Sequence, residues 1–174
     1  MSVNRSFAHV ADRSAAILIL GSMPGVESLK QQQYYAHPRN AFWPIMGELC
    51  GFDPSLPYRE RLERLIAHRI ALWDVAHQCE RPGSLDASIK TESVIANDFN
   101  ALFQAHPHIR AIFFNGGKAA ELYRRLVLPE LAEPWRSLPR TTLPSTSPAH
   151  AAMSRQQKFD AWLQIRKALT TVAV

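Results

Sequence analysis

Polar side chains that can hold water or a ligand follow directly on short apolar segments of the chain. Ser22 comes after the first such segment, Asp74 lies near the end of the second, and Asn115 follows the third. The fourth is followed by Ser-Thr-Ser-Pro-Ala-His at residues 145–150. A carboxamide is neutral near pH 7, so Asn115 can orient water or hydrogen-bond the edge of a ligand, but it is not a strong base.

A second group of chemically capable residues is the run Tyr-Tyr-Ala-His-Pro-Arg-Asn-Ala-Phe-Trp at residues 34–43. Its four aromatic rings suit stacking on a flat ring, and its Arg and Asn suit hydrogen bonds to that ring's edge. The preceding loop, Gly-Ser-Met-Pro-Gly at residues 21–25, lacks the Lys-Ser/Thr pair of a phosphate loop and the third Gly of a dinucleotide fingerprint. On its own, a loop of this kind is more often an ordinary tight turn.

The order of elements predicts how these residues meet. Apolar runs ended by Gly, Pro or polar residues predict strands at residues 16–20, 70–75, 109–114 and 141–143. Helical periodicity predicts helices at residues 40–50, 58–68, 91–105 and 118–126, and a last helix that begins at Ser154. We expect residues 1–14 to form a loose arm and residues 76–90 a long loop. The alternation predicts an α/β fold with a parallel sheet covered on both faces, whose carboxyl strand ends share one rim.

Composition sets further expectations. A chain of 174 residues predicts one domain, spanning residues 1–174. A net charge of +5 and a pI of about 9.6 suit a polyanion such as DNA, or simply a soluble basic protein. No apolar run approaches the roughly 20 residues of a membrane span, and no secretory signal is visible, so we expect a cytoplasmic protein without a membrane partner. Two cysteines are too few for an iron–sulfur cluster, and the histidines show no metal-ligand spacing, so we expect no metal and no cofactor.

The loop at residues 21–25 and the run at residues 34–43 together resemble the first motif of the uracil-DNA glycosylase superfamily, most closely its deoxyinosine (hypoxanthine) DNA glycosylase branch. Phe-Asn-Gly at residues 114–116 is similar to a segment of the mismatch-specific members, and Ser-Pro-Ala-His-Ala at residues 147–151 resembles the superfamily's second motif. The resemblance implies a three-layer αβα fold with a central four-stranded parallel sheet.

The resemblance also implies roles for the catalytic residues. Asn40 and Asn115 are expected to carry activity, with Asn40 holding the attacking water. Met23 occupies a position where related enzymes have a water-positioning Asn or Asp, so it leaves vigorous uracil excision in doubt. The structural alternatives are a helix N-cap for Asn40 and a turn before glycine for Asn115.

In the base pocket, Ser22 and Met23 are expected to bind the base, and Phe42 is expected to stack on it while Tyr35 closes the other side. Asp74 could accept a hydrogen bond from the N1–H of hypoxanthine. The alternatives are core packing for the two rings, and for Asp74 a loop cap or an ion pair with Arg81.

The expected DNA contacts are phosphate contacts by cations and a thin wedge in the minor groove. They comprise Arg39, Lys118, Ser147, Pro148, Ala149 and His150. Arg140 and Arg155 are further candidate phosphate contacts, and each cation could instead be a solvated surface charge.

These expectations combine into a monofunctional DNA glycosylase that flips out and hydrolytically removes deaminated bases, chiefly hypoxanthine, in base excision repair. Its expected partner is DNA containing deaminated bases, and it is expected to act as a monomer. The alternatives are a uracil or mismatched-thymine glycosylase on the same fold and a catalytically inactive nucleic-acid-binding module. A Ser hydrolase is disfavoured because the chain lacks the Gly-x-Ser-x-Gly elbow.

Overall fold

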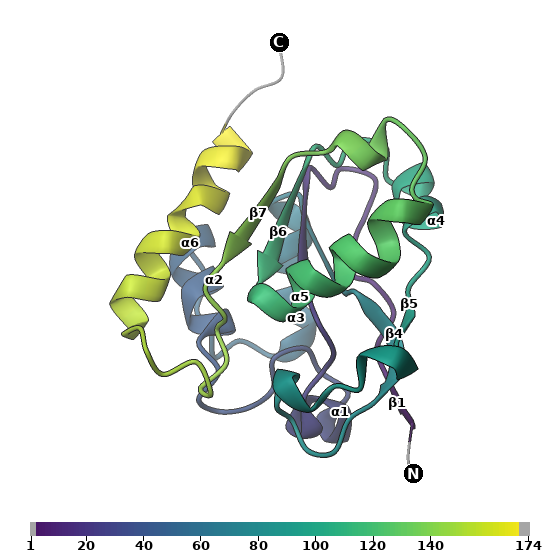
Figure 1. Cartoon of the computed structure of the whole chain (residues 1–174). Coiled ribbons are helices and arrows are strands. Elements are labelled where there is room, and N and C mark those ends of the chain that lie inside the picture. The colour runs from purple at the N-terminus through teal and green to yellow at the C-terminus, as the bar shows by residue number, and fades with distance from the viewer. Residues whose placement is uncertain (1–2, 171–174) are drawn as a thin grey trace.

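The computed structural model, which describes residues 3–170, contains a four-stranded parallel sheet in the order β3-β2-β6-β7 (Figure 1). The strands are β2 (Ile17–Gly21), β3 (Ile70–Asp74), β6 (Ala111–Asn115) and β7 (Arg140–Leu143). In the central strand, Leu20 lies opposite Trp73 on one side and Phe114 on the other. The expected α/β fold with a four-stranded parallel sheet is therefore confirmed, and each strand lies within two residues of its predicted bounds.

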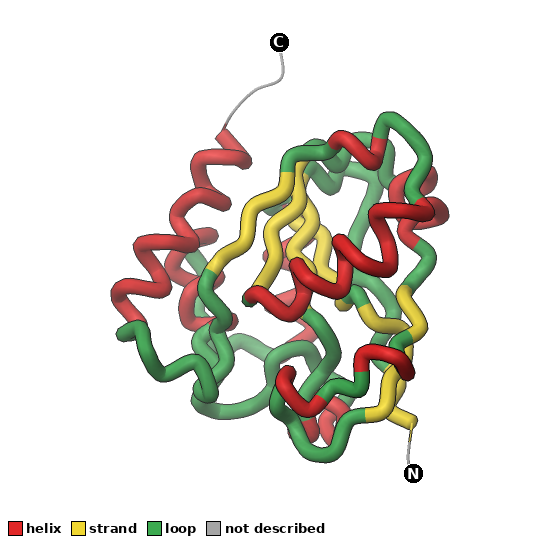
Figure 2. The backbone as a smooth tube through the Cα atoms, in the orientation of Figure 1, coloured by secondary structure: helices red, strands yellow, loops and turns green. Residues whose placement is uncertain are grey.

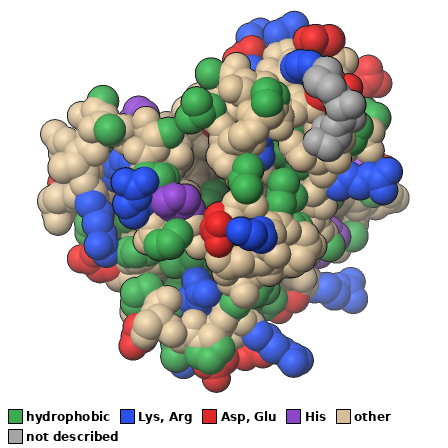
Figure 3. Space-filling view, turned by 90° about the horizontal axis from the view of Figure 1, so that it is seen from below, with side chains coloured by type: hydrophobic (Ala, Val, Ile, Leu, Met, Phe, Trp, Pro, Cys, Tyr) green, Lys and Arg blue, Asp and Glu red, His purple; other side chains and the backbone are tan. Residues whose placement is uncertain are grey.

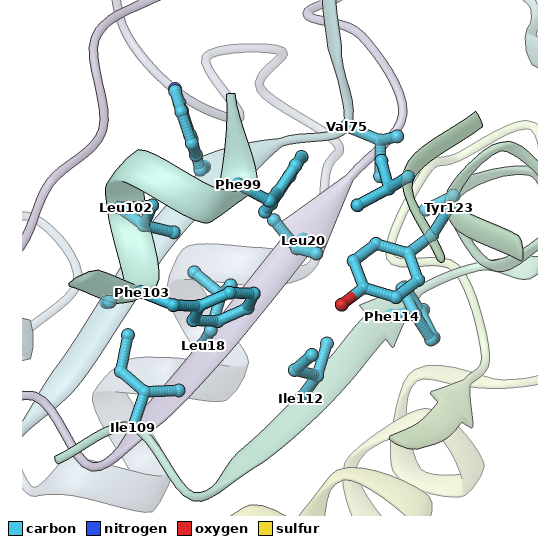
Figure 4. Packing of buried hydrophobic residues seen from close by; sticks show 14 of the residues in the cluster. Leu18, Leu20, Val75, Phe99, Leu102, Phe103, Ile109, Ile112, Phe114 and Tyr123 are labelled. Atoms are coloured by element: carbon cyan, nitrogen blue, oxygen red, sulfur yellow. The ribbon is translucent and has the colours of Figure 1, made fainter. Parts of the chain in front are cut away.

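Helices cover both faces of this sheet. On one face lie α2 (Phe42–Cys50), α3 (Tyr58–Ala67) and α6 (Arg155–Thr170), which pack around Ile17, Ile19 and Phe113. On the other face lie α4 (Phe99–Ala105) and α5 (Gly117–Leu122), which enclose Leu18, Leu20 and Ile112 (Figure 4). Alternate residues of β2 thus point into opposite cores, as expected for a strand that is buried on both sides.

The sequence patterns predicted the ends of two helices correctly. Gly51 ends α2 with φ +75° and donates its N–H to the carbonyl of Gly47. Before α6, the backbone N–H of Ser154 donates to Oε1 of Gln157, and the N–H of Gln157 donates to Oγ of Ser154, at 2.8 and 3.1 Å. This reciprocal pair is the capping box that the sequence predicts.

A second, antiparallel sheet in the order β1-β4-β5 was not predicted. It consists of β1 (Val3–Arg5), β4 (Ala76–Glu80) and β5 (Ile95–Ala96). The predicted loose arm at residues 1–14, of which residues 1–2 lie outside the described part, therefore contains a strand, and the predicted long loop at residues 76–90 begins with one. The helix predicted at residues 91–105 begins only at Phe99, as α4. Val3 pairs with Glu80 across 77 positions of sequence, and local patterns do not reveal so distant a partner.

The remaining helical segments are short. They comprise α1 (Val26–Gln31), 3₁₀ turns at Asp86–Ser88, Thr91–Ser93, Leu128–Glu130 and Trp135–Ser137, and a π-helical turn at Tyr123–Val127. The loops that follow the strands gather at the lower edge of the molecule in the orientation of Figure 2. Within residues 3–170, no helix is long and apolar enough to cross a membrane.

Candidate active site

A cavity of about 600 Å³ opens at the carboxyl ends of the parallel strands. Figure 3 views the molecule from this side, and its surface is visibly hollowed there. Residues at or just after the carboxyl end of each of the four strands contribute to the lining, as the parallel topology requires. Of the residues predicted from sequence, the cavity brings together Ser22, Met23, Tyr35, Asn40, Asp74, Asn115, Lys118, Ser147, Pro148, Ala149 and His150.

The wall formed by β2 and β3 is shaped by a glycine. A Cβ atom at Gly21 would lie 2.5 Å from Oδ1 of Asp74 and 2.8 Å from the hydroxyl oxygen of Tyr35. Such contacts are far shorter than van der Waals distance, so only glycine lets both side chains occupy their observed positions. The carboxylate, the phenol and the bare backbone of Gly21 therefore form one crowded corner of the cavity.

Asp74 is a buried carboxylate, only 3% exposed. Its Oδ2 has no hydrogen-bond partner within the described part of the chain. Burial, followed by the nearby charge of Asp86, raises the pKa of Asp74 to about 7, while Arg81 acts in the opposite direction. No ion pair joins Asp74 to Arg81 within residues 3–170, because the Arg81 guanidinium donates instead to the carbonyl oxygens of Pro24 and Met23 at 2.6 and 3.4 Å.

The predicted stacking role of Phe42 is corrected by its position. Its side chain is fully buried and does not line the cavity. Its ring instead stacks on that of Tyr35, with the centroids 4.1 Å apart and the planes at 22°. Tyr35 does line the cavity, as Tyr34 does, and Phe42 supports the Tyr35 ring from behind.

The two asparagines are already partly engaged. Oδ1 of Asn40 accepts the backbone N–H of Phe42 at 2.9 Å. The oxygen therefore caps the start of α2, which was the structural alternative for Asn40, although Ala41 is the formal N-cap residue. Asn115 is 6% exposed, and both ends of its carboxamide bind Thr146: Oδ1 accepts the backbone N–H and Nδ2 donates to Oγ1, each at 2.9 Å. Asn115 therefore ties the loop after β7 to β6.

Met23 and Ser22 differ in what they offer the cavity. The Met23 side chain is 6% exposed and packs with Ala76, Cys79 and Ile89 in a small core beneath the loop. Ser22 donates its hydroxyl to Oδ1 of Asp86 at 2.6 Å. Asp86 also lines the cavity, and the sequence analysis did not single it out. The signal that could have found it is an acidic residue in a long segment after a strand.

A smaller basic cavity, of about 310 Å³, adjoins the first. Asn40 and Thr146 line both cavities. The charged residues that line the smaller cavity are Arg39, Arg155 and Lys158. Lys158 is only 5% exposed, and its Nζ donates to the carbonyl oxygen of Ser147 at 3.2 Å. None of these three cations forms an ion pair within the described residues.

Lys118, which was predicted to contact DNA, is placed differently. Its Nζ lies 3.7 Å from Oε2 of Glu121 and 3.3 Å from Oγ1 of Thr91, so its charge is already partly balanced.

The sequence analysis missed Lys158 because a lysine within a helical pattern is usually a solvated surface charge.

Comparison with known proteins agrees with the geometry. The model of the family described as "Uracil DNA glycosylase superfamily" matches residues 7–169. Two curated proteins named "Hypoxanthine DNA glycosylase", from Methanosarcina barkeri and Methanosarcina acetivorans, are each 42% identical to this chain. The matches cover 67% and 68% of this chain and 73% and 75% of those proteins.

Similarity also extends to a solved structure. A solution NMR structure of a protein proposed to be a uracil DNA glycosylase, from Methanosarcina acetivorans, superposes with a TM-score of 0.80 at 36% identity. The match covers 98% of this chain and 100% of that one.

Proposed function

The chain belongs to the uracil DNA glycosylase superfamily, and from this membership we propose that it is a monofunctional DNA glycosylase that removes hypoxanthine from DNA. The observation that carries the choice of base is the buried Oδ2 of Asp74, which has no partner within the described residues and belongs to a residue of the cavity wall. A purine with a hydrogen on N1 can supply the missing donor. Hypoxanthine has this hydrogen, whereas adenine presents a lone pair there and would be repelled by the ionised carboxylate.

Binding requires that the nucleotide leave the helix, because the sugar–base bond cannot be reached inside the base stack. In the cavity, the ring of Tyr35 would stack on the extruded base, an interaction worth about 1–3 kcal/mol. His150 would face the base or an adjacent phosphate, since its Nε2 is buried and has no hydrogen-bond partner among the described residues. The small residues Pro148 and Ala149 would fill the space that the base leaves in the duplex.

The proposed reaction is hydrolysis without a covalent enzyme intermediate. Lys118 is the lysine that lines the large cavity, and its ammonium group is held by Glu121 and Thr91. Water would therefore attack C1′ as the bond to N9 breaks, and the negative charge on the departing purine would be met by fixed donors such as the amide hydrogens of Asn40 and Asn115. We also propose that residues 1–174 form one domain, in keeping with a similar chain whose match covers 98% of this one. We propose further that the protein acts as a monomer.

The proposal is tested by measuring base release from duplexes that contain hypoxanthine, uracil, xanthine or mismatched thymine. We expect hypoxanthine to be released fastest. Asn115→Ala should slow release by about 10-fold or more, because it leaves the buried Thr146 N–H without its acceptor, a cost of about 1–3 kcal/mol, and frees the loop. Faster release of uracil or thymine would favour the alternative glycosylase activity. DNA binding without release of any base would identify an inactive binding module.

The basic cavity leads to a prediction about DNA affinity. We expect Arg39, Arg155 and Lys158 to bind one backbone phosphate beside the flipped nucleotide, because the three cations line one cavity and the buried Lys158, which has no ion pair within the described residues, is stabilised by an anion. Arg39→Gln and Arg155→Gln should each weaken DNA binding and lower the slope of log K against log salt by about one. Fluorescence anisotropy at several salt concentrations measures both quantities.

The matched control for these two variants is Arg124→Gln, which removes the same charge from an exposed position that lines neither cavity. It should leave the salt dependence within error of the parent. A duplex with one methylphosphonate at the contacted position should bind the Arg155 variant and the parent equally well. If the variants lose affinity no more than the control does, the phosphate contact is wrong.

A further inference from the structure

Hydrolysis of the sugar–base bond needs a group that accepts a hydrogen bond from the attacking water and thereby directs the oxygen lone pair at C1′. Residues singled out from sequence are poorly suited to this task in the folded chain. The Met23 side chain is packed in a small core, and a thioether is at best a weak acceptor. Oδ1 of Asn40 already accepts the N–H of Phe42, and its Nδ2 can only donate.

We propose that Asp86 is the residue that orients and deprotonates the attacking water. This assignment rests on the glycosylase activity proposed above and identifies a catalytic group for it. Asp86 lines the large cavity and is half-buried, so its carboxylate can reach a water molecule in the cavity. Its Oδ1 is held by the Ser22 hydroxyl at 2.6 Å, which leaves Oδ2 for the water.

The carboxylate of Asp86 is held in place by a segment that is attached to the loop after β2 at several points. Arg81 donates to the carbonyl oxygens of Met23 and Pro24, and the N–H of Val26 donates to Oγ of Ser84 at 2.8 Å. Beneath these bonds, Ile89 packs against Met23. A carboxylate on a segment anchored in this way is fixed relative to the motif loop, as a positioned catalytic base requires.

The other carboxylates that line the cavity are less suited to this role. Asp74 is almost completely buried beside Gly21 and Tyr35, at the wall where the base would be read. Glu27 accepts a hydrogen bond from Nε2 of Gln31 at 2.6 Å within the short helix α1. Of these carboxylates, Asp86 therefore combines two features: it is partly exposed in the cavity, and it accepts a hydrogen bond from Ser22 in the loop after β2.

In the proposed step, the water oxygen forms a bond to C1′ while the C1′–N9 bond breaks. The electron pair of the broken bond stays on N9 of hypoxanthine, and one proton of the water passes to Oδ2 of Asp86. The hypoxanthine anion takes a proton from solvent as it leaves, and Asp86 returns its proton to solvent. The products are an abasic site and neutral hypoxanthine, so no further reactant is needed.

The test compares Asp86→Asn with the parent enzyme in single-turnover release of hypoxanthine and in binding to the abasic product duplex. We expect release to slow by about 10²- to 10⁴-fold, the usual contribution of a general base, while the Kd for abasic DNA stays within about three-fold. Ser22→Ala should slow release by about 10-fold, because it loosens the carboxylate without removing it. In Asp86→Ala, added formate should restore part of the rate by supplying a carboxylate.

The matched control is Glu60→Gln, which neutralises an exposed carboxylate on α3 that lines neither cavity, and it should slow release less than three-fold. Asp86→Asn that retains a parental rate would overturn the assignment, as would a rate loss explained entirely by weaker DNA binding. A parent enzyme that releases no base from any of the four duplexes would overturn the proposed function, and this assignment with it. If the parent enzyme releases hypoxanthine and Asp86→Asn releases it at the same rate, the assignment of Asp86 is overturned but the proposed function is not.

Discussion

Gly21→Ala should abolish most of the hypoxanthine release. The added Cβ would lie 2.5 Å from Oδ1 of Asp74 and 2.8 Å from the Tyr35 hydroxyl, so both side chains must move. These residues form the wall that would read the base and the ring that would stack on it, and misplacement by about 1 Å commonly costs on the order of 10²-fold in rate. Overpacking of this kind also lowers the free energy of unfolding by about 1–3 kcal/mol.

The control for this prediction must be equally crowded but remote from the cavity. Gly47 in α2 meets that need, because a Cβ there would lie 2.6 Å from the backbone oxygen of Phe52 and the residue does not line either cavity. Gly47→Ala should be destabilised to a similar degree while retaining its rate at a temperature where it stays folded. If Gly21→Ala and Gly47→Ala lose activity equally under those conditions, the loss of base release in Gly21→Ala comes only from its lower folding stability.

Asp74→Asn should lower kcat/KM for hypoxanthine by about 10- to 100-fold. The carboxylate would accept the N1–H of the base in a charge-assisted hydrogen bond, which is worth about 1.5–3 kcal/mol. An amide oxygen is a weaker acceptor, and the new NH₂ group would face the N1–H donor unfavourably. Discrimination between hypoxanthine and adenine should fall as well, because the negative charge that repels the adenine N1 lone pair is removed.

The pH profile provides a sharper measurement of the same residue. Burial raises the pKa of Asp74 to about 7, so the carboxylate is protonated below this pH and ionised above it. If Asp74 accepts the N1–H, the rate should rise with pH through about 7, and Asp74→Asn should lose this dependence. A rate that instead increases as the pH falls through about 7 would contradict the acceptor role and assign Asp74 as a proton donor.

The free energy of unfolding should fall as the pH rises, whereas the rate of base release should increase. An unfolded Asp has a pKa of about 3.9, so between that pH and about 7 the folded state binds a proton that the unfolded state has lost. The free energy of unfolding should therefore fall as pH rises through this window, by at most about 1.4 kcal/mol per pH unit. At pH 8, Asp74→Asn should unfold at higher urea than the parent, which urea titration at pH 5 and 8 can measure. Equal midpoints for the two proteins at pH 8 would contradict this account.

The strands and most helices follow from local features of the chain. Residues 17–20 are apolar at every position and are followed by glycine, so they predict a strand that is buried on both faces. The capping box at Ser154 and the glycine at residue 51 mark helix ends because a cap is satisfied within a few residues. The same reasoning placed Ser22, Asp74, Asn115 and residues 145–150 at one edge, because parallel strands end on the same side.

Individual roles within that edge depend on contacts between residues that are distant in sequence. Phe42 and Tyr35 are both aromatic residues in one motif, and only their packing shows which ring faces the cavity. Asp86 becomes a candidate catalytic group only because β1 and β4 form a second sheet and Arg81 fastens the following segment to the loop after β2. Lys158 becomes a candidate phosphate ligand only because its helix is packed so that the ammonium is buried at the carbonyl of Ser147.

The amino-acid sequence by itself therefore determined the family, the parallel sheet and the edge at which the site lies, since each depends on residue order, periodicity or spacing within short segments. The tertiary structure alone decided which ring, which carboxylate and which cation face the cavities. Those assignments depend on burial and on hydrogen bonds such as Ser22 to Asp86, which spans 64 positions, and no pattern within a short segment encodes such a partner.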